Sequence, residues 1–432
     1  MASERRAWIE HAHTAITIGL EHTGVGPESP PVYLVPTGAE AVPVKLADGF
    51  ERSQLLNLES NALAKWCSTR AYGLRERHRA SRVERLSREL SSSLEQLGGE
   101  SYHGLIPVVA HCATSTYQPE ADSQEEKVGH FSHLYSLWLL ALWIWDDMHD
   151  VSKAHAGTDF VPQSIALVKA EFSNSGLRHG EGLVRRSHLE GPVELRQQLN
   201  DCCHLLNQVR AELLQCFSSS ELEPLFSETH QFFDSFATKV TMTQKSMDLV
   251  DDYERNRALS CGILPCYEME ILFKAYERNI PLSTVRGYIH QHPRECRAGA
   301  LISSLHCAAV NDLFSVYKDR TIEDTENFPS VFAPGKTVTD YFEGAVATVE
   351  YVRDRYRDFL AQCKSLPAGQ VRDLLVEVWD TNMEGNLGFH YCVSRYREGA
   401  TVLNALVDDQ QSADAKAAVF SSVVDSPRPL PV

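Results

Sequence analysis

The chain has 432 residues, 43% of them hydrophobic and 23% charged, as in a globular protein of one large or two ordinary domains. Its net charge of −17 argues against nucleic acid as a partner, and it means that an acidic ligand would have to bind through cations. The first residues lack a secretory apolar core, the longest apolar run is too short to span a bilayer, and the eleven cysteines lack zinc-site spacing. We therefore expect a cytoplasmic protein with reduced thiols and no transmembrane segment.

Helical patterns dominate the chain after an N-terminal part of different character. Residues 25–50 carry several prolines and predict irregular chain, with one candidate strand over 30–36. Apolar residues at helical spacing then predict helices over 57–97, 125–147, 192–217, 221–258, 297–319, 338–363 and 370–396. The mixed segment 151–191 predicts a surface loop with a short helix. Together these patterns predict a single all-α domain.

The apolar helix predicted over 125–147 leads into an acidic cluster, "DDMHD". Asp146 and Asp150 are one turn apart, so they share a helical face, and Asp147 can reach the same place. Three such carboxylates repel one another unless a cation neutralises them, and oxygen-only ligands favour a hard ion such as Mg²⁺. A solvated helix terminus is the alternative, although acids at a C-terminal end oppose the helix dipole.

A second apolar helix, "GALISSLHCAAV", leads into "NDLFSVYKD". Asn311, Ser315 and Asp319 fall on one helical face as oxygen ligands, and a polar stripe at a helix end is the alternative. Two apolar helices that each end in oxygen ligands predict one site, with metal ions at the mouth of a dry pocket. Because Mg²⁺ is usually held partly by substrate phosphate, we expect a ligand with a phosphate head and a hydrocarbon body.

The two stretches resemble the metal motifs of class I terpene synthases, in particular the microbial and fungal sesquiterpene cyclases. "DDMHD" resembles the aspartate-rich motif, and "NDLFSVYKD" resembles the Asn–Ser–Glu motif, with Asp319 where the family has Glu. Lys318 matches a lysine that contacts the diphosphate in that family. The resemblance implies that Asp146, Asp147 and Asp150 bind metal together with Asn311, Ser315 and Asp319.

A third stretch, "YERNRALSCGILP", resembles the segment of the family that senses the diphosphate. Arg257 matches the sensing arginine, with Arg255 as a rival. The linker and effector positions that follow are Ser260, Cys261 and Gly262. Gly262 and Pro265 are expected to disrupt the helix, which would free backbone carbonyls to face the substrate.

A fourth stretch, "GNLGFHYCVSRY", resembles the terminal Arg–Tyr motif of microbial cyclases. Arg395 would bind the diphosphate, and Tyr396 would support it by hydrogen bonding. The resemblance covers roughly residues 100–400 and implies a class I terpenoid synthase bundle around an apolar active-site cavity. The expected organisation is an N-terminal extension over 1–60, the cyclase α-domain over 61–412 and a disordered tail over 413–432.

The resemblance also implies a reaction. Three Mg²⁺ ions, which Mn²⁺ could replace, would help to ionise farnesyl diphosphate. The allyl cation would then cyclise to a sesquiterpene hydrocarbon, with a humulene-like macrocycle as one expected product. Cavity walls would keep water from the cation, and aromatic faces would stabilise it by roughly 0.5–2 kcal/mol each. The candidate wall residues, for each of which core packing is the alternative, are Leu139, Trp143, Phe314 and Phe389. A homodimer is a further expectation from the family.

Three other functions compete with cyclisation. A chain-lengthening prenyltransferase would share the fold and the metals, but it would carry a second aspartate-rich motif where this chain has "NDLFSVYKD". An HD-type phosphohydrolase would use the pair His149–Asp150, with His130 and His133 upstream. A non-catalytic isoprenoid-binding protein would have no need of a complete set of oxygen donors. Because all these ligand positions hold oxygen donors, the sequence favours the cyclase.

Overall fold

A computed structural model gives the fold of the chain. The residues that it describes are 32–37, 40–45, 72–95, 102, 104–117, 119, 125–155, 160–173, 192–237, 247–321, 326–335, 337–392, 396, 399 and 413–424. Arg395 lies outside these residues. Asp150, Lys318 and Asp319 are described only through the helical backbone that carries them, so statements about their side chains remain predictions.

The chain divides into two compact units. Unit 1 comprises Met1–Arg82, Val240–Arg255 and His292–Val432, and unit 2 comprises Val83–Lys239 and Asn256–Gln291. Two helices cross from one unit into the other, namely α4 (Tyr72–Glu95) and α11 (Met247–Ser260).

Unit 2 is built around the long apolar helix predicted from the sequence, α6 (Glu125–His155). Besides the crossing helices it also contains α5 (Leu105–Thr116), α7 (Phe160–Ser173), α9 (Val193–Cys216), α10 (Ser219–Ser235), α12 (Ile263–Glu277) and α13 (Leu282–Gln291). Helix α6 packs against α5, α7 and α9, and α10 packs against α7 and α12. Because α6 has neighbours on several sides, its apolar residues are buried almost all round, including Trp138 and Trp145.

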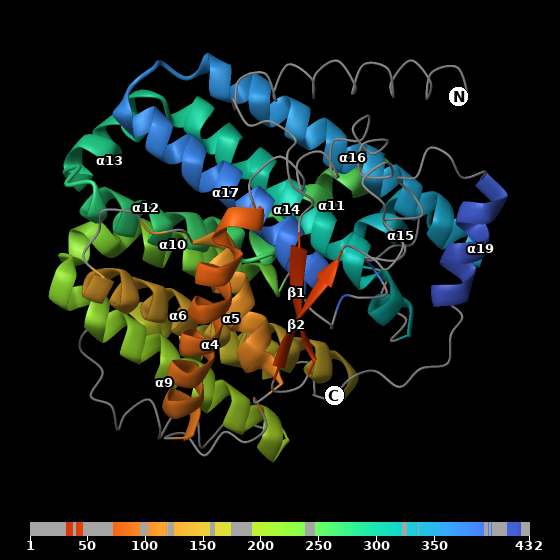
Figure 1. Ribbon diagram of the computed structural model, residues 1–432, viewed down its shortest axis with the longest axis horizontal. Helices are drawn as coiled ribbons and strands as arrows, with labels where there is room; N and C mark the ends of the chain where they lie inside the picture. Colours follow the sequence, from red (N-terminus) through yellow and green to blue (C-terminus); the bar gives the residue numbers. More distant parts are fainter. Residues whose placement is uncertain are drawn as a thin grey trace. The chain divides into compact units, whose positions relative to one another are not determined.

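Unit 1 holds the second predicted apolar helix, α14. Its described elements besides the crossing helices are β1 (Val32–Thr37), β2 (Glu40–Lys45), α14 (Pro293–Thr321), α15 (Phe328–Phe332), α16 (Val338–Ser365), α17 (Gln370–Cys392) and α19 (Ala413–Val424). Helix α14, teal in Figure 1, runs alongside α16 and α17, which are blue. At one crossing Gly299 lies against the ring of Trp379, so only a residue without a side chain fits there.

Capping residues mark where several helices begin. Helix α10 starts with a capping box, in which the Ser218 hydroxyl accepts from the Glu221 N–H and the Glu221 carboxylate accepts from the Ser218 N–H. Thr337 and Asp340 form the same arrangement at the start of α16. These local signals end the preceding loops, and tertiary packing then fixes the helices in place.

The prediction of an all-α fold is confirmed, with two local corrections. Residues 32–45 are not irregular, because β1 and β2 pair as an antiparallel hairpin in which Thr37 faces Glu40. The valines of both strands and Tyr33 of β1 favour extended chain, which accounts for part of this pairing. The expected disordered tail contains α19, because its alanine-rich sequence favours a helix, which packs against α14 and α16.

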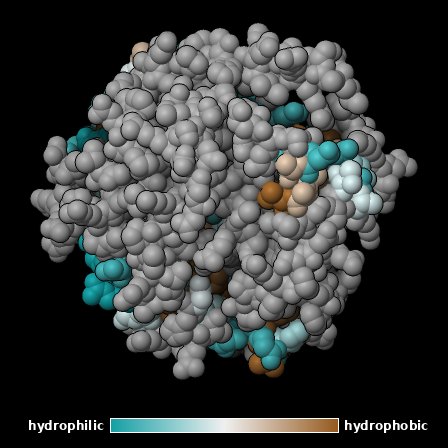
Figure 2. All heavy atoms as spheres, turned by 45° about the vertical axis from the view of Figure 1, so that its right-hand side comes forward, coloured by the Kyte–Doolittle hydropathy of each residue, from teal (hydrophilic) through white to brown (hydrophobic). Residues whose placement is uncertain are grey.

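The surface of the described residues is mostly polar. Figure 2 shows hydrophilic and a few hydrophobic side chains among the described residues that reach the visible face. Among the residues that the structure describes, Val193 and Tyr276 are the large apolar side chains that are exposed. None of the described helices has the length and hydropathy that a membrane crossing requires.

Candidate active site

The predicted metal-binding aspartates lie along the side of α6. Asp146 is exposed and Asp147 is half-buried, whereas Met148 and His149 beside them are buried. The sequence pattern predicted that the helix ends at these acids. Helix α6 instead continues to His155, because no glycine or proline interrupts it. The alternative of a solvated helix terminus therefore does not describe Asp146 and Asp147.

The predicted break in the diphosphate-sensing segment is confirmed. Helix α11 ends at Ser260, α12 begins at Ile263, and Gly262 between them is left-handed, with φ 72° and ψ 5°. Pro265 falls in the first turn of α12, where the missing N–H leaves no helical hydrogen bond unmade. A left-handed backbone favours glycine because a Cβ atom would crowd the adjacent carbonyl.

The break lies against the aspartate-bearing helix within unit 2. A Cβ atom on Gly262 would be 3.6 Å from Leu142 Cδ1 and 3.3 Å from Phe232 Cε2. Leu142 is one helical turn before Asp146. The structure thus brings two of the sequence motifs together, with the effector segment packed beside the turn of α6 that precedes the aspartates.

A buried hydrogen bond holds α6 and α12 in this register. The Tyr135 hydroxyl of α6 donates to Glu270 Oε1 of α12 at 2.7 Å, and both residues are fully buried. Burial raises the pKa of Tyr135 well above its ordinary value, with Cys266 and Glu270 adding to the effect, so the hydroxyl keeps the proton that it donates. One turn before Glu270 on α12, the Cys266 thiol donates to the Gly262 carbonyl at 3.1 Å.

The two arginines of the segment predicted to sense the diphosphate differ in burial, and the role of Arg257 stays a prediction. Arg257 is half-buried on α11, whereas Arg255 is exposed. Ser260 and Cys261 are also half-buried, and the Cys261 N–H donates to the Arg257 carbonyl at 3.2 Å. A partly buried arginine near a helix break is better placed to face a ligand than one in the solvent.

In unit 1, α14 carries Asn311 and Ser315, which are half-buried among buried neighbours. The adjacent Asp312 is buried and bonded within the fold. Its Oδ2 accepts from the Tyr253 hydroxyl at 2.7 Å and from the Phe328 N–H at 3.0 Å. Asp312 therefore anchors α14 to α11 and α15. In the described part of α14, Asn311 and Ser315 remain as the candidate metal ligands.

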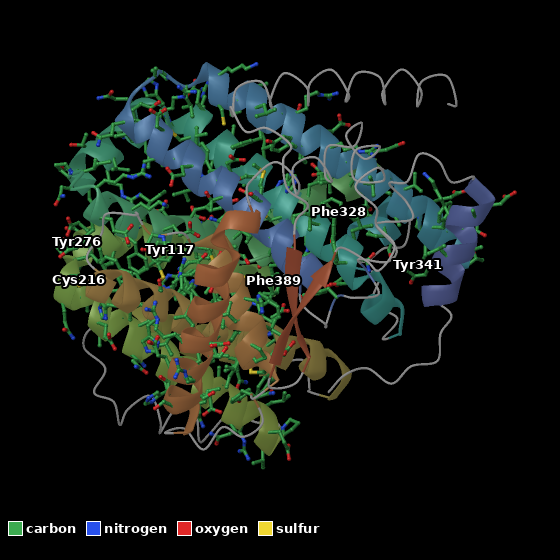
Figure 3. All side chains as sticks on the ribbon, viewed as in Figure 1. Tyr117, Cys216, Tyr276, Phe328, Tyr341 and Phe389 are labelled. Atoms are coloured by element: carbon green, nitrogen blue, oxygen red, sulfur yellow. The ribbon has the colours of Figure 1, made fainter. Side chains whose placement is uncertain are left out.

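Several predicted residues of unit 1 gather around a histidine that the sequence analysis did not single out, His390 of α17. The Asn311 amide nitrogen lies 3.0 Å from His390 Nε2. The rings of Phe314, Phe389 and Tyr396 have centroids 5.2, 4.9 and 4.4 Å from that of His390. Of these side chains, Figure 3 labels Phe389, which belongs to α17. In the sequence, His390 follows Asn386 by one helical turn. Polar residues on a buried helical face need hydrogen-bond partners, so this spacing could have indicated that His390 has a structural role.

The four candidate wall residues differ in burial. Leu139, Phe314 and Phe389 are buried, whereas Trp143 is half-buried. Phe314 and Phe389 contact side chains of their own unit, as the core-packing alternative requires. Their role in shaping a cavity stays a prediction.

The donor set of the described residues fits a hard divalent cation. Asp146, Asp147, Asn311 and Ser315 offer only oxygen, which Mg²⁺ prefers. Among the residues that the structure describes, no three His, Cys, Asp or Glu side chains lie close enough to hold a metal ion by themselves. Mg²⁺ in proteins often takes only one or two carboxylates from the chain and its other ligands from water and phosphate.

Comparison with protein families identifies the class of the protein. The model described as "Terpene synthase family 2, C-terminal metal binding" matches residues 137–358, about half of the chain. The chain therefore belongs to terpene synthase family 2, and it is a terpene synthase, a carbon–oxygen lyase that acts on a prenyl diphosphate. The match includes the aspartates of α6, Arg257 and the motif of α14, and it ends before Arg395 and Tyr396. A search of curated proteins gives no match.

Solved structures of similar fold include 2-methylisoborneol synthase from Streptomyces coelicolor A3(2). That structure is 14% identical with a TM-score of 0.50 and covers 72% of this chain and 90% of its own. Its complex with Mg²⁺ and 2-fluoroneryl diphosphate is 15% identical with a TM-score of 0.54, covering 72% and 91%. Its complex with Mg²⁺ and geranyl-S-thiolodiphosphate is 14% identical with a TM-score of 0.50, covering 74% and 93%. At these identities the likeness establishes the class I terpene synthase fold alone.

Proposed function

We propose that the protein is an Mg²⁺-dependent cyclase that binds farnesyl diphosphate, releases pyrophosphate and converts the remaining carbon chain to a cyclic sesquiterpene hydrocarbon. One observation carries the proposal: in each unit, a largely buried helix of the matched family region presents oxygen donors that are not buried. These are Asp146 and Asp147 on α6, and Asn311 and Ser315 on α14. Partly exposed donors at the side of an apolar helix suit a ligand with a charged head and an apolar body.

The protein's own part in the reaction is to hold the diphosphate while its negative charge grows. The aspartates of α6, with Asn311 and Ser315 of α14, would hold Mg²⁺, which when bound supplies positive charge to the leaving group. Arg257, Lys318 and Arg395 would donate hydrogen bonds to the diphosphate oxygens. These bonds strengthen as the carbon–oxygen bond breaks, so they stabilise the transition state more than the bound substrate.

After ionisation, the protein has to exclude water from the allyl cation. Leu139, Trp143, Phe314 and Phe389 are the proposed apolar wall, and their aromatic members would stabilise the cation through their ring faces. The carbon–oxygen bond ionises without a protein nucleophile or base. The cyclised cation then becomes a neutral hydrocarbon by losing a proton, for which the released pyrophosphate is an available acceptor. The shape of the wall would then decide which ring forms.

A shorter substrate is the second candidate. The complexes of 2-methylisoborneol synthase contain 2-fluoroneryl diphosphate and geranyl-S-thiolodiphosphate, which are analogues of ten-carbon prenyl diphosphates. That likeness favours geranyl diphosphate as an alternative to farnesyl diphosphate. Geranylgeranyl diphosphate is the third chain length to be compared.

The HD-type phosphohydrolase is disfavoured by the surroundings of His149. The ring is buried between Trp145 and Phe236, at centroid distances of 4.4 and 4.7 Å, and its Nδ1 lies 3.1 Å from the Trp145 carbonyl. A metal ligand needs an accessible nitrogen. We therefore expect His149→Ala to affect stability more than chemistry, whereas Asp146→Ala removes activity.

The test is incubation of purified protein with farnesyl, geranyl or geranylgeranyl diphosphate in separate reactions containing Mg²⁺. Gas chromatography of an organic extract identifies the product, and a coupled assay measures pyrophosphate. We expect a cyclic hydrocarbon from farnesyl diphosphate and no reaction when EDTA is added. Pyrophosphate release without any terpene, from all three substrates, would overturn the cyclase assignment.

A further inference from the structure

We infer that His390 is a positioning residue for the metal site: its Nε2 accepts a hydrogen bond from the Asn311 amide and thereby aims the amide oxygen at the metal ion. The inference rests on the proposed function, in which Asn311 is a metal ligand. His390 touches neither the metal nor the substrate in this role, so it acts only through Asn311.

The polarity of the hydrogen bond follows from the other nitrogen of the ring. His390 Nδ1 lies 2.6 Å from the Asn386 carbonyl oxygen, which can only accept, so Nδ1 carries a proton. In the neutral ring Nε2 is then an acceptor. At 3.0 Å its partner has to be the NH₂ group of Asn311, because the amide oxygen would meet a lone pair.

The oxygen of Asn311 is the atom that this arrangement leaves for a cation. An amide binds a hard metal through oxygen and not through nitrogen. With the nitrogen directed at His390, rotation of the amide by half a turn costs a hydrogen bond and sets two acceptors together. His390 therefore selects one of two amide orientations that would otherwise be similar in energy.

A second hydrogen bond makes the arrangement rigid. The Asn386 amide of α17 donates to the Cys307 carbonyl of α14 at 3.0 Å, one turn before Asn311. Asn386 and His390 are one turn apart on α17. The two helices are thus joined at successive turns, from Cys307 to Asn386 and from His390 to Asn311, and the Nδ1 bond of His390 to the Asn386 carbonyl links the two joints.

Packing prevents the imidazole from turning away. His390 is 1% exposed, and the rings of Phe314, Phe389 and Tyr396 surround it. A buried ring bonded through both nitrogens has one allowed orientation. The aromatic residues near the metal motif therefore have a use besides forming an apolar wall, because they fix the histidine that orients the ligand.

The test measures binding of inorganic pyrophosphate by calorimetry at a series of Mg²⁺ concentrations, so it does not depend on turnover. His390→Phe keeps the ring but removes the acceptor, and we expect the Mg²⁺ concentration for half-maximal binding to rise roughly 10–100-fold, the usual effect of losing such a support. His390→Gln can place its Oε1 near the position of Nε2, and we expect it to restore binding to near the wild-type level. His306→Phe is the matched control, because it replaces another buried histidine of unit 1.

Circular dichroism and the melting temperature verify that each variant is folded. If His390→Phe does not fold, His390→Met takes its place, because methionine is flexible, apolar and only a weak acceptor. The inference is overturned if Asn311→Ala loses Mg²⁺-dependent binding while the folded His390 variant without an acceptor matches the wild type, or if His390→Gln is as impaired as His390→Phe. Absence of Mg²⁺-dependent binding by the wild type would instead refute the proposed function, and this inference with it.

Discussion

Asn311 and Asp312 show how neighbouring residues with similar side chains take different parts in the protein. Both offer oxygen, but Asn311 is half-buried whereas Asp312 is 3% exposed and accepts two hydrogen bonds from within unit 1. A step of one residue turns a helix by about 100°, so the two side chains face different neighbours. Asn311 thus remains with the proposed ligand face, and Asp312 belongs to the support behind it.

Substitution of these neighbours should separate activity from stability. We expect Asn311→Ala to lose nearly all turnover of farnesyl diphosphate with little change in the free energy of unfolding. Asp312→Ala should lower that free energy by about 1–3 kcal/mol, because the buried Phe328 N–H loses its acceptor, whereas the Tyr253 hydroxyl keeps the Glu326 carbonyl at 3.0 Å. Urea unfolding and a pyrophosphate-release assay on both variants measure the two effects. Normal turnover in Asn311→Ala would remove that residue from the ligand set.

His306 of α14 is a second buried histidine of unit 1, and it makes stability depend on pH. Burial lowers its pKa from 6.5 to about 3, so it stays neutral in the folded protein where the unfolded chain would take up a proton. The contribution of the neutral His306 to the free energy of unfolding is complete above pH 6.5. It is lost as the pH falls from there towards about 3, because protonation then favours the unfolded chain.

The pH dependence can be measured with His306→Phe. Between pH 6 and pH 4, the free energy of unfolding of the wild type should fall more steeply than that of the variant, by at most about 1.4 kcal/mol per pH unit. Chemical denaturation at several pH values gives the two slopes. Equal slopes would mean that His306 does not titrate differently in the folded and unfolded chains.

At the scale of the elements, the break between α11 and α12 determines where the sensing segment can point. Its left-handed Gly262 packs against Leu142 of α6 and Phe232 of α10. The sequence predicted the break from Gly262 and Pro265, because both residues interrupt helices locally. The helices against which the break packs come from elsewhere in the chain, and the local sequence could not name them.

Replacement of the glycine at the break should be costly where replacement of a helical glycine is not. Gly262→Ala forces a side chain into the left-handed region and against Phe232, and we expect a loss of about 1–2 kcal/mol. Gly129→Ala is the matched control, because Gly129 lies within α6 with open space around it, and there alanine should stabilise by roughly 0.5–1 kcal/mol. Thermal or urea unfolding of both variants checks the contrast. A neutral Gly262→Ala would show that the break tolerates a side chain.

At the scale of the whole molecule, the proposed ligands are divided between the two units. Asp146 and Asp147 belong to unit 2, and Asn311 and Ser315 belong to unit 1. The proposed function uses donors from both. Because a ligand bound only by the folded protein stabilises it by mass action, Mg²⁺ with pyrophosphate should protect the chain against unfolding.

The melting temperature with and without Mg²⁺ and pyrophosphate tests whether stabilisation by this ligand needs both metal motifs. At 100 times the dissociation constant the wild type should gain about 2.7 kcal/mol, seen as a higher melting temperature. The gain should vanish in Asp146→Ala and equally in Asn311→Ala, and it should persist in Asp234→Ala, which removes a surface carboxylate paired with Lys169. If removal of either motif left the gain intact, the two motifs would not serve one ligand.

The helical fold could be predicted from the sequence, because apolar residues recur at the helical period. The candidate site residues were assigned from motifs on these helices, and their roles stay predictions. The spacing of Asn311 and Ser315 on α14, and of Asp146 on α6, follows from that periodicity alone. The end of α6 and the helix α19 were mispredicted, because the acids suggested an end where the helix continues, and the proline-rich residues after α19 suggested an irregular tail. Of the hairpin, the sequence predicted a strand near β1 but not β2, because prolines are unfavourable in strands.

The sequence by itself determined the class of the protein, since the donors, their spacing and the helix break are properties of short segments. Only the tertiary structure decided that His390 meets Asn311, a contact between residues 79 positions apart, and that Leu142 and Phe232 pack against Gly262. Such contacts depend on how whole helices pack against one another, and packing is set by the sum of many side-chain contacts. No short stretch of sequence contains that sum, so the support of the site became visible only in the folded chain.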